Sequence, residues 1–89
     1  MPTISMFYGI VVSLFYKDMG RHHLPHVHVR YQDSKATVAI QDGSVLDGQF
    51  PAKQLRLVQA WIEIHRDELQ ADWDLAASGE EPFRIAPLQ

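Results

Sequence analysis

Three short stretches of β-type residues, separated by turn signals, constrain the fold of this chain more than any other feature. Residues 26–31 and 35–41 alternate in side-chain character, and Asp33-Ser34 lies between them. Asp42-Gly43 is a strong hairpin signal and leads into a short stretch over 44–49. Successive hairpin connections predict an antiparallel meander.

A long amphipathic helix is predicted after these strands. Pro51 suits the first turn of a helix, and the helical pattern runs from Ala52 to about Gln70. Its apolar arc is wider than the stripe usual for a surface helix. Asp72 resembles an N-cap, which predicts a short second helix over 73–78.

Together these elements predict an α+β domain. We expect an antiparallel sheet of three to four strands, arranged as a meander and packed on one long helix, plus a short C-terminal helix. The apolar run over 10–16 supplies one of the strands, and 83–85 is a candidate edge strand. A chain of 89 residues predicts a single domain over 1–89.

Composition limits the classes of function. The chain lacks cysteine, which excludes a disulfide framework and a thiol nucleophile, and fits a cytoplasmic protein. No targeting segment or membrane-spanning run is evident. Residues 1–56 carry six Lys/Arg against four Asp, a balance of +2, whereas residues 57–89 carry two Arg against seven Asp/Glu, a balance of −5. A polyanion could therefore meet only the first part, through a local basic patch of Lys17, Arg21, Arg30 and Lys35.

Four of the five histidines lie within the sequence His22-His23-Leu24-Pro25-His26-Val27-His28. Alternate side chains of a strand share a face, so His26, His28 and Arg30 are expected to point to one side. Such imidazoles can bind one metal ion or act as acid and base on one substrate. The candidate catalytic residues here are His23, His26, His28 and Arg30, with Arg30 holding phosphate.

His65 is the remaining candidate catalytic residue. It falls near the centre of the predicted helix's apolar arc, where a polar side chain needs a partner. Either it hydrogen-bonds Glu68 or backbone in the core, or it approaches the strand histidines and completes their site. A metal site would need a third ligand such as His23 or Glu68, and no carboxylate is evident behind the histidines. We expect no bound metal or other cofactor.

Several segments together resemble one family of short bacterial proteins, the domain of unknown function 4160 family. The matching segments are Met1-Pro2-Thr3-Ile4-Ser5, Gly9-Ile10, His23-x-Pro25-His26-Val27-His28, Gly48-x-Phe50-Pro51, Trp61-x-x-x-His65-x-x-Glu68-Leu69-x-x-x-Trp73 and Ile85-x-Pro87-Leu88. Family members usually carry an Asp-His pair followed by two prolines. This chain instead has His22-His23 and a single Pro25 after Leu24.

The resemblance implies a toxin–antitoxin pair. Such proteins are often encoded beside a second small domain, the domain of unknown function 2442 family, and the present type is the proposed toxin. The implied partner is a small antitoxin-like protein. By analogy with small toxins on α+β scaffolds, the expected target is RNA or the translation machinery. Metal-independent cleavage of RNA would use the histidine cluster as acid and base.

Two other functions fit the sequence. One is a non-enzymatic interaction module, in which Trp61 and Trp73 anchor a partner protein or a second copy in a homodimer. The other is a histidine-based metal-binding domain. Size-exclusion chromatography and elemental analysis separate these alternatives.

Overall fold

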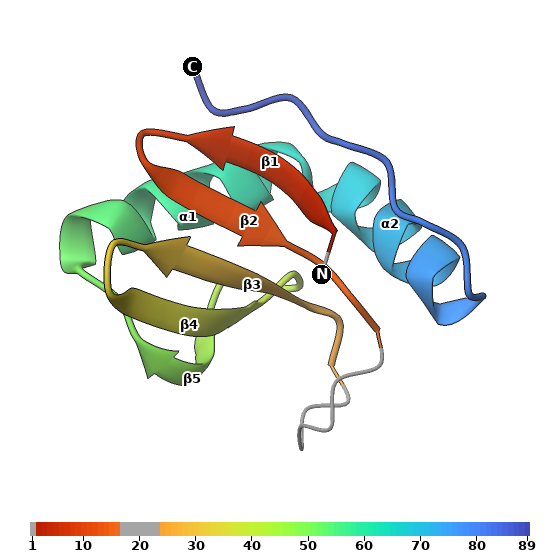
Figure 1. The fold of residues 1–89 in the computed structure, drawn as a ribbon, viewed down its shortest axis with the longest axis horizontal. Coiled ribbons are helices and arrows are strands. Elements are labelled where there is room, and N and C mark those ends of the chain that lie inside the picture. The colour runs from red at the N-terminus through yellow and green to blue at the C-terminus, as the bar shows by residue number, and fades with distance from the viewer. Residues whose placement is uncertain (1, 17–23) are drawn as a thin grey trace.

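The computed structural model describes residues 2–16 and 24–89 and confirms an α+β fold (Figure 1). Five strands form one antiparallel sheet in the order β1-β2-β3-β4-β5. Two helices follow the strands. The strands are β1 (Thr3–Phe7), β2 (Ile10–Ser13), β3 (His26–Tyr31), β4 (Ser34–Ala39) and β5 (Val45–Gln49), and the helices are α1 (Ala52–Ile64) and α2 (Arg66–Ala77).

The sheet is larger than the predicted three to four strands, because the chain begins with a strand that the turn signals did not mark. β1 pairs with β2 through the tight Tyr8–Gly9 turn, where both residues have positive φ (50° and 79°). Positive φ is uncommon for tyrosine, so this turn lacks the usual sequence signature. β2 ends at Ser13, although a strand was predicted over 10–16.

One face of the sheet packs against the helices and forms the core. In Figure 1, α1 crosses behind the sheet, and α2 continues past the end at which β2 stops and β3 begins. Apolar side chains of alternate strand positions meet the buried side of α1. The fully buried members of this core include Ile10, Val12, Val27, Val38, Val58, Trp61, Ile62 and Leu69.

The single helix predicted over 52–70 is in fact two helices, divided at His65. His65 has φ −110° and ψ 22°, outside the helical range, although its N–H still bonds the Trp61 carbonyl. Asp67 and Glu68 lie in the first turn of α2, where the helix dipole favours negative charge. The predicted short helix is the end of α2, so Asp72 is not an N-cap.

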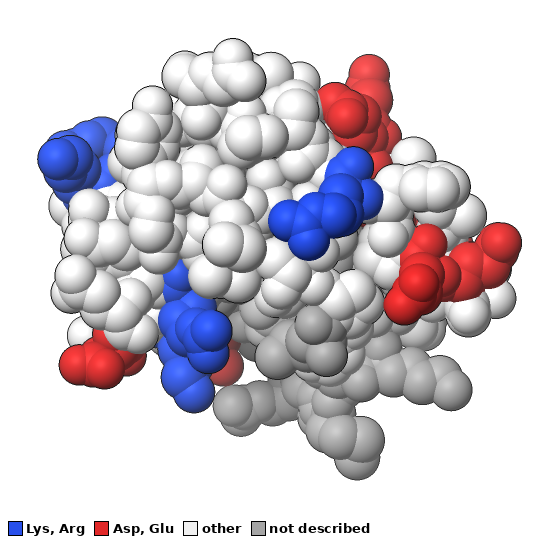
Figure 2. All heavy atoms as spheres, turned by 45° about the horizontal axis from the view of Figure 1, so that its top comes forward, with Lys and Arg blue, Asp and Glu red and all other residues white. Residues whose placement is uncertain are grey.

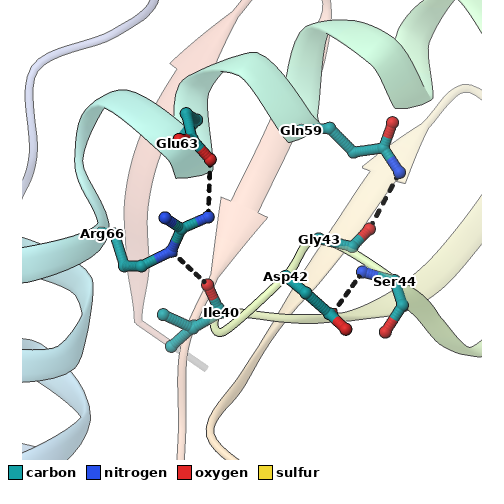
Figure 3. Close-up of polar contacts among 7 residues, drawn as sticks. All are labelled: Ile40, Asp42, Gly43, Ser44, Gln59, Glu63 and Arg66. Atoms are coloured by element: carbon teal, nitrogen blue, oxygen red, sulfur yellow. Dashed lines mark hydrogen bonds and ion pairs between the residues drawn. The ribbon is translucent and has the colours of Figure 1, made fainter.

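Polar contacts attach the loop between β4 and β5 to the helices (Figure 3). The Gln59 amide donates to the Gly43 carbonyl at 2.9 Å, and the Arg66 guanidinium donates to the Ile40 carbonyl at 3.2 Å. Within the loop, the Ser44 N–H donates to Asp42 at 2.9 Å. This hydrogen bond holds the pKa of the Asp42 carboxyl below its usual range. The predicted two-residue hairpin at Asp42-Gly43 is therefore a longer, anchored connection.

The C-terminal segment runs beside β1 in extended form (Figure 1). Its Ile85 N–H donates to the Ile4 carbonyl at 2.8 Å, and the Trp61 indole donates to the Ala86 carbonyl at 2.8 Å. The edge strand predicted over 83–85 does not form, because these described residues are not part of any strand ladder. Neither helix of the described ranges has the length and apolar character that crossing a membrane requires.

Candidate functional site on the open face of the sheet

The strand register places two rows of side chains across the sheet face that points away from the core. Alternation along each strand and pairing between strands together determine which side chains share this face. The first row is Thr3, Ser13, His28, Thr37 and Asp47, and the second is Met6, Val11, Arg30, Lys35 and Gln49. Neither described helix covers these rows. We call this surface the open face.

A hollow of about 560 Å³ lies on the open face. Its polar lining comes from the centre of the two rows, where hydroxyl, imidazole and cationic groups converge on one space. The residues that line it are Thr3, Val11, Ser13, His28, Val29, Arg30, Lys35, Ala36, Thr37, Asp47 and Gly48.

Gly48 allows β4 and β5 to approach closely at this hollow. A Cβ atom at Gly48 would lie 2.4 Å from the Lys35 carbonyl oxygen, and Gly48 has φ +84°. The pairing of β4 with β5 shifts its register between Thr37 and Val38. Only glycine fits such an approach at this φ, so Gly48 determines the shape of this side of the hollow.

Arg30 and Lys35 form the cationic part of the site. They are direct cross-strand partners in the β3–β4 ladder, and both side chains are exposed. Neither makes a hydrogen bond or ion pair with another described residue. Like charges directly opposite each other destabilise an antiparallel pair. An anion between them would remove that repulsion and gain two charge-assisted contacts.

His28 lies beside this cation pair, two residues before Arg30 on β3. Its ring stacks on Phe15, with centroids 4.8 Å apart and planes inclined by 22°. Its Nδ1 atom lies 3.5 Å from the Thr37 hydroxyl oxygen. The ring is half-buried and lines the hollow, and its Nε2 atom is buried, so Nδ1 is the ring nitrogen that lies beside the Thr37 hydroxyl.

His26 approaches His28 but does not share its surface position. The two rings meet edge to face with centroids 5.1 Å apart. His26 is 0% exposed, donates from Nδ1 to the Leu24 carbonyl at 2.8 Å, and packs its ring on Trp73 of α2. The β3 histidines are therefore close enough to interact, but only His28 lines the hollow. His26 attaches the start of β3 to α2.

His65 lies at the α1–α2 junction, on the helical side of the sheet. Its Nδ1 donates to the Glu68 carboxylate at 2.6 Å, and its ring leans on Trp61 with centroids 5.6 Å apart. The structure thus does not bring His65 together with the histidines of β3. His22 and His23, with Lys17 and Arg21 of the expected basic patch, fall outside the described residues.

The expected tryptophan anchors are not surface features. Trp61 is 0% exposed and Trp73 is 8% exposed. Trp61 packs on Phe7, and Trp73 contacts Tyr16 and His26. Both tryptophans therefore stabilise the fold and offer almost no area to a partner.

Among the described residues, no three His, Asp or Glu side chains are arranged to hold a metal ion. The groups in the hollow that would attract an anion are the cations Arg30 and Lys35 and the hydroxyls of Ser13 and Thr37, and Asp47 adds one carboxylate to the same lining. Figure 2 shows Lys and Arg side chains as separate groups with uncharged surface between them. On the face in view there is no continuous basic field of the kind that duplex-binding proteins present.

Sequence reasoning predicted the shared face of His28 and Arg30 but not most of the residues that lie beside them on the open face. Alternation along β3 places those two side chains on one face. Ser13 and Thr37 join them only through cross-strand register, which no pattern within a single strand specifies. Lys35 was expected in a basic patch, but its position opposite Arg30 also depends on that register.

Comparison with known proteins identifies the family. Neither the curated proteins nor the solved structures contain a significant match to this chain. A model of one protein family, described as a domain of unknown function, matches residues 9–74, well over half of the chain. That segment contains β2 to β5, α1 and most of α2, and with them His28, Arg30 and Lys35 of the open face. The chain therefore belongs to the DUF4160 family.

Proposed function

We propose that this protein is the toxin component of a bacterial toxin–antitoxin pair and acts on RNA through the open face of its sheet. The single observation that carries the proposal is the pair Arg30 and Lys35. These cations face each other, form no ion pair with a described residue, and lie in one hollow with the His28 imidazole and the Asp47 carboxylate. That arrangement costs stability in the free protein, which a phosphate ligand would restore.

The proposed reaction is cleavage of RNA by its own 2′ hydroxyl. His28 accepts the proton of that hydroxyl at Nδ1, because its Nε2 atom is buried, and the 2′ oxygen forms a bond to phosphorus. The bond from phosphorus to the 5′ oxygen breaks, and this oxygen takes a proton from water. Arg30 and Lys35 stabilise the negative charge that develops on the phosphoryl oxygens. His26, which is fully buried, positions the His28 ring and does not touch the substrate in this scheme.

The test is growth arrest on expression in bacteria. We expect arrest by the wild type, and loss of arrest in His28→Ala and in Arg30→Gln. Arg56→Gln is the matched control because Arg56 is an exposed cation on α1, on the other side of the sheet. Circular dichroism confirms that each variant folds. Full arrest by both open-face variants would contradict the proposal.

The partner in this proposal is a small antitoxin-like protein, encoded by the adjacent reading frame. Co-expression of that reading frame is expected to relieve the arrest. If growth stays arrested, the assignment to a toxin–antitoxin pair fails even if the protein proves to act on RNA.

A further inference from the structure

One row of the open face changes from cationic to apolar residues along its length. This change points to a particular form of RNA. In the row that contains Arg30 and Lys35, the next positions toward β1 are apolar. Val11 is the cross-strand partner of Arg30, and Met6 is the partner of Val11. Met6 is 57% exposed, so its apolar side chain is accessible on this face.

We propose that Met6 and Val11 form a platform for an unstacked nucleobase, so that the open face binds single-stranded RNA and discriminates against duplex. This inference rests on the proposed function and specifies its substrate. Neighbouring strands lie roughly 4.8 Å apart, so Met6 lies two strand spacings, or about 10 Å, from Arg30 across the sheet. That span is comparable with the reach of one nucleotide from its phosphate to the far edge of its base.

The charges of Arg30 and Lys35 beside the platform favour single-stranded RNA over a second protein as its ligand. A second protein would meet an apolar patch bordered by two cations that lack described partners. Single-stranded RNA supplies both complements, because its phosphates pair with the cations and the apolar face of a splayed base covers Met6 and Val11. In a duplex the base faces are stacked on one another and cannot reach a flat surface.

The parallel row supports the same ligand. Thr3, Ser13 and Thr37 place hydroxyl groups beside the platform and the cations. Hydroxyl side chains can donate to and accept from the ribose and the edges of an exposed base. The open face therefore offers separate contacts for the phosphate, the sugar and the base of one nucleotide.

The experiment measures binding of a short fluorescent RNA by anisotropy at several salt concentrations. The riboses carry 2′-O-methyl groups, which prevent cleavage through the 2′ oxygen. The same strand is measured alone and annealed to its complement. The variants are Met6→Ser and Arg30→Gln, with Ile64→Ser as the control because Ile64, at the end of α1, is equally apolar and 65% exposed.

We expect the single strand to bind at least tenfold more tightly than the duplex. Met6→Ser should weaken binding of the single strand by roughly fivefold without changing its salt dependence, since it removes apolar contact only. Arg30→Gln should weaken binding and reduce the slope of log K against log salt by about 0.7, the value for one phosphate contact on a single strand. Ile64→Ser should bind as the wild type does.

Three failures are distinguishable. If duplex and single strand bind equally, or if Met6→Ser binds as Ile64→Ser does, the base platform is wrong while the proposed action on RNA stands. If neither form of RNA binds, both proposals fail. If the wild type binds single-stranded RNA selectively but does not arrest growth, only the toxin assignment fails.

Discussion

Arg30 of β3 lies directly opposite Lys35 of β4 on the open face, and neither side chain pairs with a carboxylate among the described residues. Antiparallel partners have Cβ atoms roughly 4.5–5.5 Å apart, so the two cations repel each other. A sheet selected for stability alone would place opposite charges here. Under the proposed function, an anion bound between the two cations would offset this cost.

The first prediction concerns the stability cost of that pair. Lys35→Glu converts a repulsive cross-strand pair into an attractive one and should raise the free energy of unfolding by about 1 kcal/mol. Urea denaturation at low and at high salt measures it, and the gain should shrink as salt screens the charges. Arg84→Glu, on the exposed C-terminal segment, makes the same change in net charge and is the control. An unchanged or lower stability in Lys35→Glu contradicts the repulsion argument.

The second prediction separates the two histidines of β3. His26→Ala removes a fully buried ring and its hydrogen bond to Leu24, so it should lower the free energy of unfolding by about 3 kcal/mol. His28 is half-buried, and His28→Ala should cost only about 1 kcal/mol. Urea denaturation compares the two variants.

Growth arrest distinguishes the same variants in another way. Lower temperature should restore arrest to His26→Ala if its defect is one of folding. It should not restore arrest to His28→Ala, in which the proton-accepting group is missing. Equal destabilisation of the two variants would show that the difference in burial has no energetic consequence.

The third prediction tests the close approach of β4 and β5. Gly48→Ala combines positive φ with a Cβ position 2.4 Å from the Lys35 carbonyl oxygen, so it should cost about 3 kcal/mol. Gly79→Ala is a matched control, because Gly79 has the same φ of +84° but no atom within 4 Å of its added Cβ. It should cost only about 1 kcal/mol. If the two variants lose similar free energy of unfolding, the positive φ alone explains the cost and the steric argument is wrong.

The sequence allowed the fold class to be predicted, but not the details that depend on contacts between elements. Alternation over 26–31 matches the bounds of β3, because period-two patterning is a property of a single strand. The helix division at His65 was not predictable, since apolar spacing continues without interruption from Trp61 to Leu69.

The same distinction holds for the candidate site. His28 and Arg30 are separated by one residue, so their shared face follows from local geometry. Their cross-strand partners Ser13 and Lys35 lie on other strands, and the pairing depends on turn lengths and on the bulges in β1 and β5.

The last prediction concerns Asp72, a buried carboxyl of α2 that holds the C-terminal segment. It is 3% exposed, and its Oδ1 accepts the Phe83 N–H at 2.9 Å, whereas its Oδ2 has no hydrogen-bond donor among the described residues. Burial raises the pKa of the Asp72 carboxyl above its ordinary value of 3.8, and the charge of Glu68 adds to this effect. The Phe83 hydrogen bond opposes the shift but does not cancel it.

A raised pKa means that the folded protein holds the Asp72 proton more tightly than the unfolded chain does. The contribution of Asp72 to stability is therefore complete below pH 3.8 and is lost as the pH rises through the folded-state pKa. Asp72→Asn keeps an oxygen acceptor for Phe83 and cannot ionise. We expect its stability relative to the wild type to increase as the pH rises above 3.8, and then to level off.

Urea denaturation from pH 4 to neutrality measures this difference, and Asp42→Asn supplies the control. The pKa of Asp42 is lowered from 3.8, so its stabilising contribution is present throughout that range and is lost only in more acidic solution. The difference in free energy of unfolding between Asp42→Asn and the wild type should therefore stay constant over this pH range. The corresponding difference for Asp72→Asn should rise with pH. A constant difference for Asp72→Asn would mean that its carboxyl titrates alike in the folded and unfolded chains, and that burial at the junction of α2 with the C-terminal segment leaves its pKa unchanged.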